Sequence, residues 1–392
     1  MRRVFFLIVA ICVFGVAACV ALLPEGYVVN TPIRGLLFGA EPPPPSELQR
    51  RIQLPPGFRI DTFATGIRNA RFMRFTATGD LLVSSPREGA IFLLEPDSDG
   101  DGASDSQRVL IGDLRRPHGL DFHGDWLYIA EVDGVRRVRY EAETQRLIGG
   151  LESVIAELPD QGNHWTKTLR FGEDGWMYVS IGSSCNVCIE GDPRRATLVR
   201  YQPDGSNEQI FARGLRNAVG FDFHPETREI WATDNGRDLL GDDFPPCEFN
   251  RVVQGGFYGW PFANGSSVID PDVGSGHEAE VAASISPEHG FVAHTAPLGM
   301  TFYRGEQFPE RYRRAAFVAQ HGSWNRSTKS GYRVVMLEWD SDGKISESDF
   351  VIGFELDEDV IGRPVDVIDG PDGALYITDD YTGAVYRVSY SG

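Results

Sequence analysis

Histidine, arginine and asparagine side chains recur along this chain at similar positions, each just before a short apolar segment. Imidazole titrates near neutral pH and exchanges protons, while guanidinium groups bind carboxylates and other planar anions. If these side chains converge, they form a site for a planar anionic ligand with acid–base chemistry beside it. The set consists of Asn69, Arg71, His118, Asn163, His164, Arg216, Asn217, His294 and Arg363.

A repeating pattern of strands places these residues in the same phase. Each copy has a short apolar segment, an acidic or glycine turn, and a second segment rich in aromatic and β-branched residues, which is typical of β-strands. The first segments of the six copies are residues 71–75, 118–122, 168–171, 219–223, 298–302 and 365–367. The copies are roughly 50 residues apart, with insertions after the fourth and fifth, and this is the spacing of propeller blades.

Six such copies predict an all-β protein with a six-bladed β-propeller. A single four-stranded blade cannot bury both of its faces, whereas a radial arrangement buries each face against a neighbour. A β-sandwich with coincidental turns is the alternative, and it leaves the common phase of the copies unexplained. Because the inner strands of a propeller line a central channel, we expect the polar residues that precede them to meet at one end of it.

The N-terminal segment indicates export from the cytoplasm. Arg2 and Arg3 precede an apolar run over residues 4–23, which is typical of an export signal and long enough to span a bilayer. Val-Ala-Ala-Cys at 16–19 also resembles a bacterial lipoprotein cleavage box. An uncleaved anchor, a lipid anchor and a released protein all place the body outside the cytoplasm, at the periplasmic face.

We therefore expect three parts in the chain. Residues 1–23 are the signal peptide or membrane anchor, 24–53 are a Pro-rich tether, and 54–392 are the propeller domain. The formal net charge of -19 argues against a nucleic-acid partner, because such a surface repels phosphate backbones.

Cysteine spacing predicts one local disulfide. Cys185 and Cys188 are close in sequence, and outside the cytoplasm such a pair favours a disulfide that braces a loop. A zinc site needs a second pair, and a redox site needs a thioredoxin-like βαβ context. Cys247 is then a free thiol, or it pairs with one of the other two.

Several motifs, in this order along the chain, give a family resemblance. They are His164 followed by Leu-Arg-Phe-Gly at 169–172 and Ile-Gly at 181–182, Gly-Leu-Arg-Asn at 214–217, and Gly-Gly-Phe-Tyr-Gly-Trp-Pro at 255–261. With them, residues 54–389 resemble the glucose/sorbosone dehydrogenase family, the soluble sugar dehydrogenases that depend on pyrroloquinoline quinone (PQQ), and most of all its L-sorbosone dehydrogenase branch.

The resemblance implies roles for particular residues. His164 matches the catalytic base, which takes the proton of the substrate hydroxyl as hydride passes to the quinone. Arg216 and Asn217 match residues that contact the quinone carbonyls, where a guanidinium stabilises developing charge. Gly236 and Arg237 match positions whose backbone carbonyls hold an active-site Ca²⁺.

The resemblance also implies other cofactor contacts, but this chain lacks several of the family's residues at these positions. Arg363 matches one of two arginines that pair with PQQ carboxylates, and the second falls at Val365. The family's glutamine near the second blade falls at Pro117, with His118 beside it, and the acidic partner of the catalytic histidine falls at Ser183. Residues 320–326 stand in place of a fifth-blade lysine, so we expect His321 and Arg326 to supply the donors there, with Trp324 as a stacking face.

A second metal site is predicted from alternating carboxylates. Asp97, Asp99 and Asp101 precede a glycine as in the first half of an EF-hand loop, and Asp105 could add a ligand. The loop is expected to join two blades, where it either holds a structural Ca²⁺ or is a solvated turn.

The preferred interpretation is a membrane-tethered, periplasm-facing dehydrogenase that uses PQQ and Ca²⁺. Its substrate is expected to be an aldose, sorbosone or a similar small aldehyde, and its electrons leave to a quinone or cytochrome acceptor. A calcium-dependent propeller lactonase is one alternative, since those enzymes hold a metal in the channel with carboxylate and amide side chains. A propeller that binds ligands without the cofactor is the other.

Overall fold

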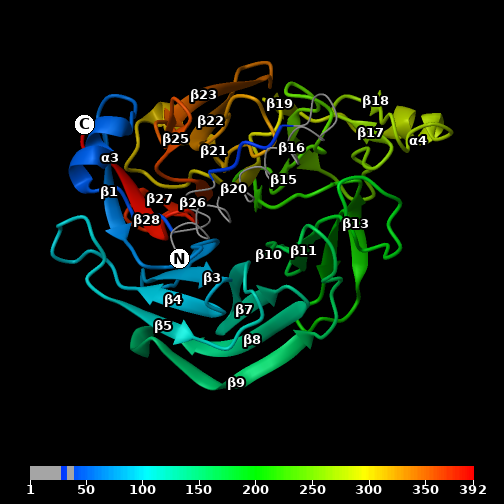
Figure 1. Ribbon diagram of the computed structural model, residues 1–392. Helices are drawn as coiled ribbons and strands as arrows, with labels where there is room; N and C mark the ends of the chain where they lie inside the picture. Colours follow the sequence, from blue (N-terminus) through cyan, green and yellow to red (C-terminus); the bar gives the residue numbers. More distant parts are fainter. Residues whose placement is uncertain (1–27, 33–38) are drawn as a thin grey trace, which may run out of the picture.

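The computed structural model describes residues 28–32 and 39–392, and six four-stranded antiparallel sheets are arranged in it around a central axis (Figure 1). The predicted six-bladed β-propeller is therefore confirmed. The predicted signal or anchor segment, residues 1–23, lies outside the described residues. Among the helices in the described part of the chain, none is long and apolar enough to cross a bilayer.

Each blade is a meander whose first strand lies nearest the axis. The first three blades are β2 (Met73–Phe75), β3 (Leu81–Ser85), β4 (Ala90–Leu94) and β5 (Gln107–Ile111); β6 (Leu120–His123), β7 (Trp126–Glu131), β8 (Gly134–Glu141) and β9 (Arg146–Ile155); and β10 (Lys167–Phe171), β11 (Met177–Ile181), β12 (Thr197–Tyr201) and β13 (Gln209–Arg213).

The other three blades carry the insertions. Their strands are β14 (Phe221–Phe223), β15 (Ile230–Asp234), β16 (Cys247–Val252) and β19 (His289–Phe291); β20 (Pro297–Phe302), β21 (Ala316–Gln320), β22 (Arg333–Trp339) and β23 (Ile345–Val351); and β26 (Pro364–Asp369), β27 (Leu375–Asp379), β28 (Ala384–Tyr390) and β1 (Phe58–Ala64). The inserted elements are β17 (Ala263–Asn264), β18 (Val268–Ile269), α4 (Glu278–Ala283), β24 (Glu355–Leu356) and β25 (Asp359–Val360).

The sixth blade closes the ring with strands from both ends of the propeller. β1 forms its outer strand and pairs with β28, so that Phe58 lies opposite Tyr390. Before β1, helix α3 (Pro45–Arg51) packs on the same side of the ring: Leu48 is buried in the core, and Arg51 forms an ion pair with Asp359 at 2.7 Å. The packed body therefore includes α3, which falls within the range predicted for the tether.

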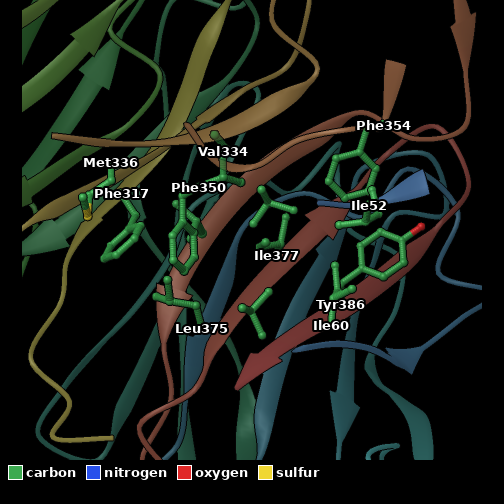
Figure 2. Packing of buried hydrophobic residues seen from close by; sticks show 14 of the residues in the cluster. Ile52, Ile60, Phe317, Val334, Met336, Phe350, Phe354, Leu375, Ile377 and Tyr386 are labelled. Carbon is green, nitrogen blue, oxygen red and sulfur yellow. The ribbon is translucent and has the colours of Figure 1, made fainter. Parts of the chain in front are cut away.

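The core lies between neighbouring blades. All five residues of β27 are buried, as expected for a strand covered on both faces. Figure 2 shows this packing between the fifth and sixth blades, where Phe317 and Phe350 meet Leu375 and Ile377. Aromatic and β-branched residues fill this space because they pack well on a pleated surface.

The channel has two mouths, which differ in the chain segments that form them. First strands contact one another from blade to blade, as β6 does with β10 and β20 does with β26. We call the end where the segments preceding the first strands meet the loop mouth, and the end formed by the turns between first and second strands the turn mouth. One expectation about the loops is wrong: the segment with Asp97 connects β4 and β5 within the first blade, because the fourth strand of that blade begins only at Gln107.

Candidate active site

At the loop mouth, one buried carboxylate gathers side chains from three blades. Asp380 accepts hydrogen bonds from His321 Nε2 at 2.9 Å and from Arg363 Nη2 and Nε at 3.0 and 3.2 Å. Its other oxygen accepts from Arg71 Nη1 at 3.1 Å and Asn69 Nδ2 at 3.3 Å. Four residues that the repeat placed in phase, or that the resemblance singled out, thus meet on an aspartate that sequence analysis did not identify.

This Asp380 cluster carries a net positive charge. Although burial opposes ionisation, Arg363 and His321 hold the pKa of Asp380 well below its usual range. Burial and then Arg363 lower the pKa of His321 to about 4, so this imidazole is neutral at neutral pH. Two guanidinium groups then face one carboxylate, and Arg71 Nε is buried without a partner in the described chain. The donor set fits an anionic ligand such as the carboxylate of PQQ.

His164 is held as a neutral base. Its Nδ1 lies 2.9 Å from the Ser183 carbonyl oxygen and 2.8 Å from Ser183 Oγ, and that hydroxyl donates to the Cys185 carbonyl at 2.7 Å. Since the carbonyl can only accept, Nδ1 carries the proton and Nε2 keeps its lone pair. Burial and then Arg216 lower the pKa of His164 to about 3. Ser183 therefore fixes the tautomer without adding a charge.

Gly182 allows His164 and Asn217 to approach each other. A Cβ at Gly182 would lie 2.6 Å from the Cβ of His164 and 2.7 Å from Oδ1 of Asn217, closer than real Cβ contacts. His164 comes from the segment before β10 and Asn217 from the segment before β14. His164 of the third blade and Asn217 of the fourth blade therefore lie close together because residue 182 has no side chain.

Arg216 is buried, and its N–H groups are taken up by the protein. Nε donates to the Asn186 carbonyl at 2.9 Å, Nη1 to the carbonyls of Asn235 and Gly236 at 3.1 and 2.9 Å, and Nη2 to Asn186 Oδ1 and Asp238 at 2.9 and 3.1 Å. A guanidinium has five N–H groups, and these five bonds use them. Arg216 therefore acts on the site through its charge and by holding loops together, and it has no N–H left for a quinone carbonyl.

The predicted disulfide between Cys185 and Cys188 is present, and Cys247 is a buried free thiol. The disulfide encloses Asn186, whose carbonyl and amide oxygens are both acceptors for Arg216. Asn186 Nδ2 in turn donates to the Asp238 carbonyl at 3.0 Å. The disulfide loop thus holds Arg216 from one side and the segment after β15 from the other.

Two buried carboxylates that sequence analysis missed lie beside the predicted calcium ligands. Asp234 and Glu248 face each other across β15 and β16, and both line a cavity of about 20 Å³ together with Gly236 and Arg237. Burial raises the pKa of Asp234 to about 7, and burial with the charge of Asp234 raises that of Glu248 to about 8. The two carboxylates can offer oxygen ligands to a cation such as Ca²⁺, and Arg216 lines the same cavity. Sequence analysis could not find this pair because it depends on the register between β15 and β16.

The predicted backbone ligands have other contacts as well. The Gly236 carbonyl accepts from Arg216, and the Arg237 guanidinium binds Asp270 at 2.7 Å and Asp272 at 2.8 Å. The side chain of Arg237 therefore anchors the loop that follows β18, and only its carbonyl is available to a metal.

The remaining predicted contacts do not all join the Asp380 cluster. His118 is fully buried, with Nδ1 3.3 Å from Thr168 Oγ1, and its Nε2 is without a partner in the part of the chain described. Arg326 binds Asp243 at 2.9 Å and the Asp242 carbonyl at 2.9 Å, so it holds a neighbouring loop. Trp324 is 43% exposed, as a stacking face requires.

At the predicted second metal site, carboxylate oxygens of Asp97, Asp99 and Asp105 lie within 4.8 Å of one another. Asp101 instead accepts the Ala103 backbone N–H at 2.8 Å. The structure thus groups a different set of three aspartates from the one expected, and calcium binding at this loop stays a prediction.

Comparison with known proteins gives a consistent set of relatives. The family model for glucose / sorbosone dehydrogenase matches residues 130–387. An uncharacterized protein of Borreliella burgdorferi is 31% identical over 360 residues, covering 88% of this chain and 92% of the relative. A pyrroloquinoline quinone-dependent pyranose dehydrogenase of Coprinopsis cinerea is 23% identical over 85% of this chain, and the match spans 54% of that enzyme.

Solved structures share the fold. The holo form of the PQQ domain of the Coprinopsis cinerea pyranose dehydrogenase superposes with a TM-score of 0.74 at 22% identity, covering 86% of this chain and 97% of that one. The PQQ-bound aldose sugar dehydrogenase of Streptomyces coelicolor gives a TM-score of 0.61 at 18% identity, covering 86% and 100%. At such identities, these structures establish the propeller architecture.

Proposed function

Because this chain belongs to the glucose/sorbosone dehydrogenase family, we propose that it oxidises a sugar or a sugar aldehyde with PQQ bound at the loop mouth. Relatives described as PQQ-dependent or PQQ-bound sugar dehydrogenases support this reaction class. The observation that carries the proposal is the presence, at the same mouth of the channel, of a neutral, orientated His164 and of the cationic Asp380 cluster. When bound, PQQ supplies the two-electron acceptor of the reaction.

The side chains at the loop mouth have different roles in the proposed reaction. His164 Nε2 takes the hydroxyl proton of the substrate while Ser183 holds Nδ1–H. Arg71 and Arg363 bind the cofactor's carboxylates with the N–H groups that Asp380 does not use. The positive charge of Arg216 stabilises negative charge that develops nearby during the reaction. Because Arg216 is buried, this electrostatic stabilisation is stronger than it would be in water.

We further propose that Ca²⁺ occupies the pocket of Asp234 and Glu248, with the carbonyls of Gly236 and Arg237 as neighbours. Calcium prefers oxygen ligands, and it would offset the repulsion between the two carboxylates. The N-terminal segment would hold the enzyme at the periplasmic face of a membrane, where a quinone or a cytochrome accepts the electrons.

Titration of the apoprotein with PQQ and Ca²⁺ tests the function. We expect a change in the absorption spectrum of PQQ and dye reduction by aldoses or sorbosone only in the reconstituted protein. In His164→Ala, the spectral change should persist while dye reduction is lost. An unchanged PQQ spectrum, or lactone hydrolysis without PQQ, would contradict the proposal and favour the binding propeller or the lactonase, respectively.

A further inference from the structure

A cavity of about 1340 Å³ opens at the turn mouth, at the other end of the channel from His164. It is lined by the far ends of the first strands, which include Arg74, Asp121, Arg170 and Asp222. Its volume exceeds that of most small-molecule sites, which occupy about 300–1,000 Å³. The proposed dehydrogenase reaction assigns nothing to this end of the channel.

Charges alternate around this cavity because the repeat places one residue of each first strand at the same level. Arg74, Asp121, Arg170 and Asp222 occupy that level in the first four blades. Asp121 accepts the backbone N–H of Phe171 at 2.8 Å and lies 2.8 Å from Arg74 Nε. These bonds join neighbouring blades and neutralise the aspartate.

Asp222 is satisfied in the same way. It accepts the backbone N–H of Phe302 at 3.0 Å and pairs with Arg304 Nη1 at 2.8 Å. Both aspartates beside Arg170 therefore already have a guanidinium partner and a backbone donor.

Arg170 forms no ion pair in the described part of the chain, and the charges of Asp121, Asp222 and Asp366 act on it only from farther away. It is 4% exposed, and its Nε and Nη1 are buried without a hydrogen-bond acceptor in the described chain. Leaving a buried charged donor without an acceptor is energetically unfavourable. Since Arg170 lines the cavity, a bound ligand can place acceptor oxygens against the side of the guanidinium that faces the cavity.

The surroundings of Arg170 narrow the class of ligand. A guanidinium matches the planar fork of a carboxylate. Asp121, Asp222 and Asp369 also line the cavity, so a ligand with a single negative charge is repelled less than a dianion such as phosphate, and its hydroxyl groups can donate to these carboxylates.

The walls of the cavity also offer apolar faces. Half-buried phenylalanines occupy the next position of the repeat in the first four blades and line the cavity, where C–H groups of a ligand can pack on them: they are Phe75, Phe122, Phe171 and Phe223. We propose that the turn mouth is a second ligand site, which binds a small hydroxylated carboxylate of the sugar-acid type with its carboxylate on Arg170. The site is independent of the reaction at the loop mouth.

Calorimetric titration of the apoprotein with gluconate, sorbitol and inorganic phosphate tests this site. Gluconate should bind saturably, and sorbitol and phosphate at least about tenfold more weakly, because only gluconate combines one carboxylate with hydroxyl groups. Arg170→Gln should weaken gluconate binding at least about tenfold. The matched control is Arg228→Gln at the rim of the same cavity, where Arg228 is 55% exposed and pairs with Glu173; it should change affinity by less than about twofold.

Equal binding of sorbitol and gluconate, the absence of gluconate binding, or unchanged gluconate affinity in Arg170→Gln would overturn the proposal. The last result would indicate binding elsewhere, including the loop mouth. If Arg170→Gln does not fold, Arg170→Lys replaces it, and about tenfold weaker binding is expected from loss of the planar fork. Crystals grown with gluconate should show it on Arg170, and its location elsewhere would refute the site. PQQ titration of the variants should match the wild type, so the two proposals fail separately.

Discussion

The two mouths of the channel differ in how the chain positions their charged residues. At the turn mouth, equivalent strand positions carry Arg74, Asp121, Arg170 and Asp222, and the aspartates bind backbone groups of the next blade. At the loop mouth, residues at unequal distances from their strands converge on Asp380. The repeat therefore provides stability and a regular ring of charges at the turn mouth, whereas the loops before the first strands, whose site residues lie at different distances from the strands, provide an asymmetric site that can direct one reaction.

The largest effect is expected from the histidine of the loop mouth. His164→Ala should lower kcat of the PQQ-loaded protein by about 1,000-fold, because proton transfer loses its base while cofactor binding is retained. The measurement is steady-state dye reduction with an aldose.

The matched control for that change is a histidine at the turn mouth. His123 stacks on Phe171 there, and His123→Ala should leave kcat within about twofold. If both variants lose activity equally, the functional division between the mouths is wrong.

The next largest effect concerns the stability of the Asp380 cluster. Asp380→Asn should lower the free energy of unfolding by about 3 kcal/mol at pH 7, because it leaves the buried Arg71 and the partly buried Arg363 without their carboxylate. Urea denaturation measures this difference.

The same variant has a defined pH dependence. Because the folded-state pKa of Asp380 is depressed, its stabilisation is fully present above the pKa of an unfolded aspartate, about 3.9, and is lost as the pH falls through the folded-state pKa. The difference in free energy of unfolding between the wild type and Asp380→Asn should therefore become smaller below about pH 4. A gap that stays constant into strong acid would show that the carboxylate charge is not what stabilises the cluster.

A backbone substitution tests how closely the third and fourth blades must approach. Gly182→Ala should lower kcat by about 30-fold, because its Cβ displaces His164 and Asn217 from each other. Gly150→Ala is the control, since nothing lies within 4 Å of a Cβ built there. Wild-type turnover in Gly182→Ala would mean that the contact over this glycine is dispensable.

The smallest effect is expected from the loop that holds Arg216. Replacing Cys185 and Cys188 together by serine should weaken PQQ binding by about tenfold, because Asn186 is then less firmly held against the guanidinium. Spectroscopic titration of PQQ measures the change. Dithiothreitol should weaken wild-type binding to the same extent and have no effect on the variant; equal affinities throughout would argue against the role of the loop.

The propeller could be predicted from the sequence because strand period and turn residues are local signals that recur six times. His164, Asn217, Arg363 and His321 were also accessible, since their phase in the repeat or the family motifs marked them. Asp380 was not, because it follows a second strand, where the repeat assigns no polar residue to the mouth. It was found only through its bonds to residues from other blades.

Other site features depend on information that a sequence pattern does not carry. The opposition of Asp234 and Glu248 requires the register of β15 and β16. That all N–H groups of Arg216 are hydrogen-bonded can be known only from the position of the disulfide loop. That Arg326 does not join His321 can be known only from the position of residues 241–243, which Arg326 binds instead.

The pairing of β1 with β28 has a consequence for how the molecule is made. β28 is the only strand that pairs with β1 in the described chain, and it follows every strand of the first five blades in the sequence. Blades one to five can form in the order of synthesis from neighbouring segments, but the ring stays open until β28 has been synthesised. A chain that stops before Ala384 keeps most of its blades and yet exposes two sheet edges, which are sites of aggregation, so quality control can detect an incomplete molecule by this single missing strand.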